Sequence, residues 1–333
     1  ASANLITIAA MKHLYGKKRE IIVPTLTWVS DITSVLHNGY IPVFVDTDKR
    51  SLGMNIYQVY KKLNPDTEAV FMTHVQGFNS LTRELICSLD ELEIPLIEDV
   101  CESHGATSEG RKLGSLGLMS NFSFYYAHHM TTVEGGMVCT NDEEIYQVLR
   151  MLRSHGMVRE STNEDIKNTY AKAYPDLHPN FIFAYPGYNV RNTELSAVLG
   201  RSQLKRLDEN NSKRVRNLSI FLGSLDPDTY RTNFYTEGNC NYAFPLILNK
   251  ADMGVRNELE SAMTEANIDF RRGSAGGGNQ LRQPYLKAYK GVPSPEEFPE
   301  TEHIHNFGYY IGNYPDIEEQ RILDLCQFLN KIQ

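Results

Sequence analysis

Residues 121–139 read NFSFYYAHHMTTVEGGMVC, and the pattern of this stretch indicates the fold class. Apolar residues cluster at 121–124 and again at 136–139, in short runs that are typical of strands. The segment between them holds two adjacent histidines and ends at a Gly-Gly turn. A strand is therefore expected to deliver Ser123 and the two histidines to one edge of a sheet.

The chain before this stretch alternates between strand and helix patterns. Strands are expected at 21–23, 42–45, 69–72 and 95–97, with helical patterns near 30–38, 55–62 and 80–90. This alternation predicts an α/β domain with a mostly parallel mixed sheet flanked by helices. Ligands of such sheets bind at the carboxyl ends of the strands. The first candidates for a site are therefore the residues that follow strands: Trp28, Asp99, Glu102 and the run from Ser123 to His129.

The C-terminal part of the chain has a different pattern. We expect a polar, Pro-containing stretch at 160–186, a helix at 192–207, a strand at 242–248, and helices at 256–266 and 317–332, the last started by Pro315-Asp316. These later elements predict a smaller α+β domain. The chain is thus expected to form a large domain, 1–207, and a small C-terminal domain, 208–333.

The first residues pass directly into a helical pattern of apolar side chains, which Ser2 or Asn4 could cap. A domain seldom begins on a core helix. We therefore expect that the large domain lacks an N-terminal segment in this sequence.

The composition is that of an ordinary globular protein, with 41% hydrophobic and 22% charged residues. The formal net charge of −8 makes nucleic acid and anionic membranes poor partners. The five cysteines are odd in number and have no CxxC spacing, which predicts reduced thiols in a cytoplasmic protein. No apolar run approaches the length of a transmembrane helix.

Two groups of residues suggest chemistry, although each has a simpler interpretation. Asp99 and Glu102 follow an expected strand and could meet a cation such as a pyridinium nitrogen, or form a helix cap or a surface ion pair. His128 or His129 could exchange protons near neutral pH, or both could be structural. No metal site is expected, because adjacent histidines point in different directions and no acidic or Cys partner has ligand spacing.

Three further segments could bind a ligand or be ordinary loops and core. A turn at 185–191 carries an amide and a guanidinium, which suit phosphate or carboxylate. The only tryptophan could stack on a planar ring, although a lone Trp is more often in the core. A Gly-rich loop at 271–279 could hold a diphosphate, or be a flexible surface loop. The candidate side chains are Trp28, Asn189, Arg191, Arg271, Arg272 and Asn279.

Taken in order, these segments resemble one family over nearly the whole chain, the DegT/DnrJ/EryC1/StrS sugar aminotransferases and dehydratases. This family has the fold of PLP-dependent transferases of fold type I. The stretches that carry the resemblance are 22–25, 42–46, 97–99, 104–106, 110–117, 123–125, 134–136 and 187–191. Each stretch is weak alone, whereas their joint order and spacing are specific.

The resemblance implies roles around the ring of pyridoxal 5'-phosphate. By this resemblance Trp28 stacks on the pyridine ring and Asp99 is the partner of its nitrogen. Glu102 is implied to lie near the ring hydroxyl, where many relatives have Gln.

The resemblance also implies how the cofactor phosphate is bound. Ser123 is an implied phosphate ligand, and Ser2 is what remains of a Ser-Gly-Ser/Thr phosphate cup. Asn189 is implied to reach the phosphate from the neighbouring subunit. The protein is therefore expected to be a homodimer whose subunits share their active sites.

Position 128 departs from the aminotransferases of this family, which carry there the lysine that binds the cofactor covalently. Imidazole cannot replace that bond, and Lys112 lies in a separate motif. The resemblance therefore implies free pyridoxamine 5'-phosphate as the resting cofactor. His128 is the implied catalytic base, which removes a proton from the cofactor so that the substrate loses its C3 hydroxyl. A reference pKa of about 6.5 suits a base at neutral pH.

Two subgroups of the family share this histidine. One holds an iron–sulfur cluster through cysteines that precede the Gly-Tyr-Asn turn, and residues 156–186 contain no Cys, so no iron–sulfur cluster is expected. The other acts on GDP-4-keto-6-deoxymannose, as a 3-dehydratase of colitose synthesis, and uses glutamate to regenerate the cofactor.

The resemblance to this second subgroup implies a GDP-linked nucleotide sugar and glutamate as partners. The expected substrate ligands are Arg191, Arg271, Arg272 and Asn279. Two alternatives stay open: a PLP-dependent nucleotide-sugar aminotransferase, and a non-catalytic sugar-binding member of the family.

Overall fold

A computed structural model describes residues 1–332 of the chain, and its centre is a six-stranded sheet. The strands are β1 (Glu20–Pro24), β2 (Ile41–Val45), β3 (Thr67–Thr73), β4 (Leu96–Asp99), β7 (Met119–Ser123) and β8 (Gly136–Cys139). Their order is β2-β1-β3-β4-β7-β8, and all pairs are parallel except the antiparallel pair of β7 with β8. The predicted α/β domain with a mostly parallel mixed sheet is confirmed.

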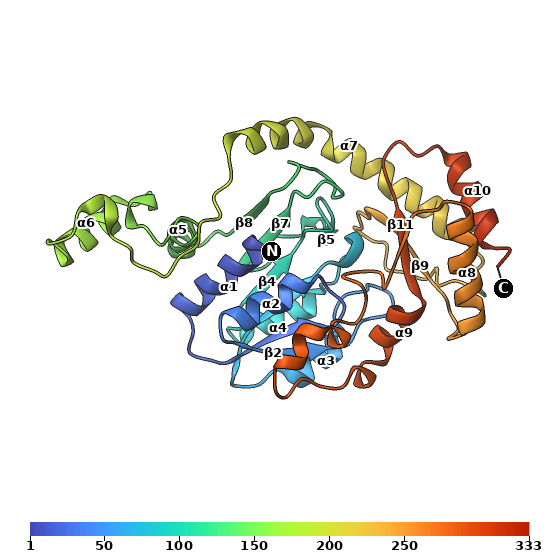
Figure 1. Cartoon of the computed structure of the whole chain (residues 1–333), viewed down its shortest axis with the longest axis horizontal. Helices are drawn as coiled ribbons and strands as arrows, with labels where there is room; N and C mark the ends of the chain where they lie inside the picture. Colours follow the sequence, from blue (N-terminus) through green and yellow to red (C-terminus); the bar gives the residue numbers. More distant parts are fainter. Residues whose placement is uncertain (333) are drawn as a thin grey trace.

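Helices cover both faces of this sheet (Figure 1). The helices around it are α1 (Ser2–Leu14), α2 (Val29–His37), α3 (Ile56–Lys62), α4 (Arg83–Glu91) and α5 (Glu143–Leu152). One apolar core joins the sheet to α1, α2 and α5, and a second core joins it to α3 and α4. Strand β3 is buried at all seven positions, as its continuous apolar run at 69–72 predicts.

The C-terminal residues form a smaller unit around a three-stranded antiparallel sheet, in the order β10-β11-β9. Its elements are β9 (Ala243–Ile247), α8 (Met253–Glu265), β10 (Phe270–Arg272), α9 (Pro299–Phe307), β11 (Gly308–Gly312) and α10 (Glu319–Leu329). Its core includes Phe221, Phe244 and Leu259. Leu26 and Phe78 of the large unit belong to the same core, so the two units share an apolar contact.

Helix α7 (Glu194–Ser224) connects the two units and has 31 residues. It is longer than the predicted helix at 192–207, and the predicted boundary between 207 and 208 falls within it. In Figure 1 it runs along the top of the molecule toward α10, against which it packs. Leu218 and Phe221, near its C-terminal end, are buried in the core of the small unit.

Three local predictions were wrong. The N-cap of α1 is Ala1, without a side-chain cap, so Ser2 and Asn4 lie inside the helix. Helix α10 begins at Glu319 rather than at Pro315-Asp316. The polar stretch at 160–186 contains a helix, α6 (Glu164–Ala173), which Asn163 caps and which projects from the body of the molecule in Figure 1.

Short elements complete the described chain. They are the β5–β6 hairpin (Thr107–Ser108, Arg111–Lys112) and the 3-10 helices η1 (Val75–Gly77), η2 (Val158–Glu160), η3 (Pro179–Phe181), η4 (Gln280–Arg282), η5 (Pro284–Ala288) and η6 (Pro295–Glu297). Among residues 1–332, no helix has both the length and the apolar character needed to cross a membrane.

Candidate active site

Asp99 is the last residue of β4 and lies at the carboxyl edge of the sheet, with 4% of its surface exposed. Its Oδ1 accepts a hydrogen bond of 2.9 Å from the backbone N–H of Cys101. Its Oδ2 accepts one of 3.1 Å from the side-chain amide of Asn4 on α1. Helix α1 packs against α2, α5, β7 and β8, and this packing brings Asn4 to the strand edge. Asp99 is thus held rigidly, as the partner of a ligand cation would need to be.

A second buried carboxyl group, that of Asp31 on α2, shares the Asn4 amide with Asp99. The Nδ2 atom of Asn4 lies 2.5 Å from Asp31 Oδ1. The hydroxyl groups of Thr27 and Thr73 also donate to Asp31. Burial raises the pKa of Asp31 well above its usual value, and the charge of Asp99 adds to this. Asp31 was not among the site residues predicted from the sequence.

His128 follows β7 and lies in a group of aromatic rings. Its Nδ1 is 3.4 Å from the carbonyl oxygen of Ser123. The centroid of its ring is 5.7 Å from that of Tyr125, 5.9 Å from that of Tyr242 and 6.4 Å from that of His104. Burial lowers the pKa of His128. The imidazole is therefore neutral near pH 7, in the form that can accept a proton.

The two neighbouring histidines are more deeply buried than His128. His104 stacks on His129 with ring centroids 5.5 Å apart, and His129 Nε2 is 2.7 Å from the carbonyl oxygen of Cys240. Burial lowers the pKa of His104 to about 3 and that of His129 well below its usual value. His129 therefore fits the alternative that the sequence left open, that of a histidine with a structural role.

Glu102 faces the same group of rings from the other side. Its Oε2 accepts a hydrogen bond of 2.7 Å from the backbone N–H of Gln76, and its Oε1 lies 3.3 Å from the hydroxyl of Tyr242, which donates to it. Burial raises the pKa of Glu102 to about 7. A carboxyl group with this pKa is a hydrogen-bond donor in about half of the molecules at neutral pH. Tyr242, just before β9, links it to His128 and was expected only as a strand residue.

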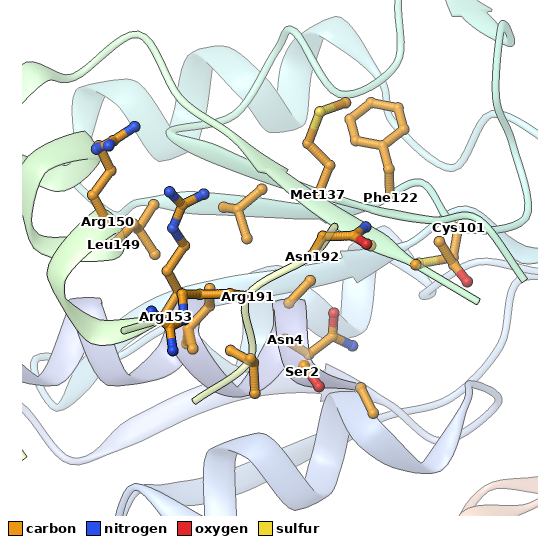
Figure 2. Close-up of a pocket in the computed structure, with 18 of the residues that line it drawn as sticks. Ser2, Asn4, Cys101, Phe122, Met137, Leu149, Arg150, Arg153, Arg191 and Asn192 are labelled. Atoms are coloured by element: carbon orange, nitrogen blue, oxygen red, sulfur yellow. The ribbon is translucent and has the colours of Figure 1, made fainter. Parts of the chain in front are cut away.

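A cavity of about 660 Å³ opens beside this cluster and is shown in Figure 2. Four predicted ligands line it: Ser2, Ser123, Asn189 and Arg191. Arg150 and Arg153 of the α5 region also line it, and neither was predicted. The Nε atom of Arg153 is buried without a hydrogen-bond partner among the described residues. Three guanidinium groups and two hydroxyl groups suit an anion such as a phosphate.

Trp28 occupies the N-cap position of α2, and 54% of its surface is exposed. It lines a second cavity, of about 230 Å³, together with Gln280, Gln283 and Tyr285. The indole is therefore a surface that a planar group can cover, rather than part of the core. The preceding residue, Thr27, donates a hydrogen bond to the buried Asp31.

The two adjacent arginines of the predicted loop have different surroundings. Arg271 pairs across the small sheet with Tyr310, and its guanidinium lies 3.4 Å from the Tyr310 hydroxyl. The Tyr310 ring is 6.1 Å from that of Tyr242, so Arg271 extends toward the His128 cluster. Side chains alternate along a strand, and Arg272 forms an ion pair of 3.2 Å with Glu260 instead.

Asn279 is fully buried and is used within the fold. Its side chain accepts from the N–H of Leu281 at 3.0 Å, which caps a 3-10 helix, and donates to Glu302 at 2.8 Å. The structure therefore does not bring Asn279 or Arg272 to the cluster around His128, contrary to the expectation that both bind substrate. Arg271 is the member of this loop that faces the cluster.

The residues present fit the cofactor that the sequence implied. The buried carboxyl group of Asp99 can pair with a ring nitrogen, and Ser123 lines the cavity whose arginines suit a phosphate. The Oδ1 atom of Asn4 and the Nε2 atom of His104 are buried without partners among the described residues, as expected for groups that await a polar ligand. Residues 1–332 contain no cluster of His, Cys, Asp and Glu suited to a metal ion.

The comparisons with known proteins agree with this geometry. Residues 1–330 match the profile of the DegT/DnrJ/EryC1/StrS aminotransferase family. The chain belongs to this family. Its relatives include the GDP-4-keto-6-deoxy-D-mannose 3-dehydratase of Yersinia pseudotuberculosis, which is 32% identical over 99% of this chain and 85% of the relative. The GDP-perosamine synthase of Caulobacter vibrioides is 33% identical over 60% of the chain and 49% of the relative.

Solved structures of family members also superpose on the chain. A GDP-4-keto-6-deoxymannose-3-dehydratase with a trapped PLP-glutamate geminal diamine matches with a TM-score of 0.88 and 29% identity, over 98% of this chain and 86% of the other. The E. coli enzyme of this name with bound hydrated PLP has a TM-score of 0.86 and 29% identity, over 99% and 85%. The predicted family, fold class and enzyme class, a PLP-dependent sugar dehydratase of the aminotransferase family, are confirmed.

Proposed function

We propose that this family member catalyses the 3-dehydration of a GDP-linked 4-keto-6-deoxy sugar, giving a 4-keto-3,6-dideoxy sugar, with pyridoxamine 5'-phosphate as cofactor and glutamate to regenerate it. The observation that carries the proposal is the neutral His128, five residues after the end of β7, near the buried Asp99 and beside a cavity that three arginines line. The names of the full-length relatives support the substrate class.

The cofactor, when bound, supplies an amine that can react with a ketone and a pyridinium ring that accepts electrons. Asp99 would hold the charge of the ring nitrogen, and Trp28 would cover one face of the ring. Glu102, in its protonated form, can donate to the ring hydroxyl, as the Gln of many relatives would. Ser2 and Ser123 would bind the phosphate.

His128 has one nitrogen free for proton transfer. Its Nδ1 faces the carbonyl oxygen of Ser123 and is best satisfied as a donor. The lone pair is then on Nε2, which would accept the proton that leaves the cofactor. Lys112 is not a substitute for the missing lysine, because its ammonium group donates to the carbonyl oxygen of Gly105 and lies near Asp208 on the surface.

The proposed homodimer is supported by exposed apolar side chains on the first half of α7. Leu195 is 78% exposed, Val198 66% and Leu204 59%. A row of such residues on one helix usually marks a protein interface. In the single chain Asn189 lines the chain's own cavity, so the proposal that it serves the neighbouring subunit needs a direct test.

That test mixes two variants, His128→Asn and Asn189→Ala, each of which is expected to have lost most turnover. If Asn189 acts in the neighbouring site, mixed dimers contain one site without a lesion and recover part of the activity. If Asn189 acts within its own chain, every site in a mixed dimer keeps one lesion, and the mixture stays inactive.

The function is tested by product analysis with GDP-4-keto-6-deoxymannose, pyridoxamine phosphate and glutamate. We expect a 3-deoxy-4-keto sugar and ammonia, and no covalent label on any lysine after borohydride treatment in the presence of pyridoxal phosphate. A 4-amino sugar would instead establish an aminotransferase. Binding of the nucleotide sugar without any product would favour the non-catalytic alternative.

The role of His128 has its own control. His128→Asn should stop turnover and leave the cofactor bound, because none of the proposed phosphate or ring contacts involves the imidazole. His129→Asn provides the comparison at the adjacent position. Retained turnover in the His128 variant would remove this residue as the base.

A further inference from the structure

Asp31 has no role in the proposed function, yet it lies beside the acid that would meet the ring nitrogen. One atom, Asn4 Nδ2, is 2.5 Å from Asp31 Oδ1 and 3.1 Å from Asp99 Oδ2. The two carboxyl groups therefore lie within a few ångströms of each other. The exposed fraction of Asp31 is 0%, that of Asp99 is 4% and that of Asn4 is 1%.

The charge of this pair depends on whether a cationic side chain contacts it. Among residues 1–332, no Lys, Arg or His forms an ion pair or a hydrogen bond with either carboxyl group. When two carboxyl groups lie this near to each other in a buried site, they cannot both be ionised. In the low dielectric their repulsion is strong, and no water replaces the hydration that each charge has lost. The site must therefore hold a proton that an isolated pair of surface acids would release.

The hydrogen bonds favour Asp31 as the group that keeps the proton. Asp99 accepts a fixed backbone N–H, that of Cys101, which stabilises its charged form. The partners of Asp31 at Oδ2 are the hydroxyl groups of Thr27 and Thr73. A hydroxyl group can turn and accept as well as donate, so these two residues can satisfy a neutral acid.

We propose that Asp31 and Asp99 share one proton and that Asp31, in the neutral form, is a positioning residue for Asp99. The pair then carries a single negative charge, which matches the single positive charge of a protonated ring nitrogen. Asn4 lines the large cavity, and its Oδ1 atom is buried without a partner among the described residues, so this network borders the cavity. The significance for catalysis rests on the proposed function, whereas the shared proton is a property of the chain alone.

Other titratable groups face the pair and would modulate it. Cys101 faces both carboxyl groups, Tyr285 faces Asp31, and Glu102, His104 and His128 face Asp99. The histidines are held neutral by burial. Glu102 has a raised pKa of its own, so an experiment on Asp31 must remove the Glu102 signal.

The experiment is infrared spectroscopy of the full chain without added cofactor, in a Glu102→Gln background. A buried protonated carboxyl group has a C=O stretch distinct from that of a carboxylate. We expect this band at pH 7 and expect its loss when Asp31→Asn is added. Glu68→Gln is the matched control, because Glu68 is also buried and accepts from a backbone N–H, that of Lys18.

Absence of the protonated band at pH 7 would overturn the proposal, and so would its persistence in the Asp31 variant. The pH dependence of the band can also be measured in the Glu102→Gln chain alone, without the Asp31 substitution, and there the band should decrease as the pH rises. A second readout is urea unfolding. Because burial raises the pKa of Asp31 in the folded chain, the unfolding constant of the chain with Asp31 should increase up to tenfold per pH unit above about pH 4, relative to Asp31→Asn.

The two proposals can fail separately. The infrared band depends on neither cofactor nor substrate, so it can be present in a chain that makes no dideoxy sugar. Conversely, a dehydratase without the band would keep the proposed function and leave Asp31 as an ordinary ionised acid.

Discussion

Glu102→Gln is expected to change how the stability of the protein depends on pH. Burial raises the pKa of Glu102 from 4.5 to about 7. This shift corresponds to about 3 kcal/mol, an upper value because the side chain is partly exposed. An acid whose folded pKa is raised contributes its full stability below the unfolded pKa. The contribution is lost as the pH rises through the folded pKa.

The wild-type chain should therefore lose up to about 3 kcal/mol relative to Glu102→Gln between pH 4.5 and pH 8. Glutamine is a fair replacement because its amide oxygen can accept from the N–H of Gln76 and its amide nitrogen can donate to the Tyr242 hydroxyl. Urea unfolding at closely spaced pH values measures the difference. Glu265→Gln, at an exposed glutamate in the last turn of α8, controls for the loss of one surface charge.

The result that refutes this reasoning is a pair of parallel stability curves. A constant difference between wild type and Glu102→Gln across the pH range would mean that Glu102 titrates in the folded chain as it does in the unfolded chain. It would then be a carboxylate at neutral pH and could not donate to the ring hydroxyl of the cofactor.

Three further predictions concern the surroundings of the site and the nearby turn. Tyr242→Phe removes a donor to the charged form of Glu102, which should raise the pKa of Glu102 further. In urea unfolding, the pH at which the chain loses stability should therefore rise by up to about one unit, and a downward shift would contradict this. Arg271→Gln should raise the KM for the nucleotide sugar about tenfold in steady-state kinetics. Arg272→Gln should leave KM nearly unchanged, because Arg272 pairs with Glu260. Equal effects of the two substitutions would argue against Arg271 as the substrate ligand. Val133 has a φ of 71°, a left-handed conformation that is strained for a β-branched residue. Val133→Gly should therefore stabilise the chain by about 1 kcal/mol in urea unfolding, and an unchanged or lower stability would contradict this.

The strands of the large sheet could be predicted because their signal is local. Short apolar runs bounded by polar turns identified all six strands, and the rule that ligands bind at the carboxyl ends of parallel strands pointed to Asp99 and Ser123. The structure places these residues at the last positions of β4 and β7. The resemblance that the sequence carries also implies that His128 stands where aminotransferases of the family have lysine, and this remains a prediction.

The helices that were missed or shortened lack such a signal. Helix α6 has no fully buried residue, and its contact with the core rests on the partly buried Ile166 and Tyr170. Two such residues are a weak apolar pattern in a polar stretch, although Asn163 was a usable cap signal. Helix α7 continues through a charged stretch after residue 207, which suggested a boundary. The later turns of α7 are stabilised by Leu218 and Phe221, which pack in the core of the small unit. This is tertiary packing, which a local sequence pattern does not reveal.

The surroundings of the catalytic groups could not be read from the sequence. Asn4 and Asp99 are 95 positions apart, and Glu102 and Tyr242 are 140 apart, so no pattern of spacing relates them. Arg271 and Arg272 look equivalent in the sequence. In the structure their side chains point to opposite faces of the strand, and Arg272 pairs with Glu260.

The sequence by itself therefore determined the family and the order of the strands along the chain, because each is carried by residue types within short segments. The tertiary structure decided which groups are charged. Burial and long-range neighbours shift the pKa values of His128, Glu102 and Asp31, and a linear sequence contains neither solvent exposure nor distance.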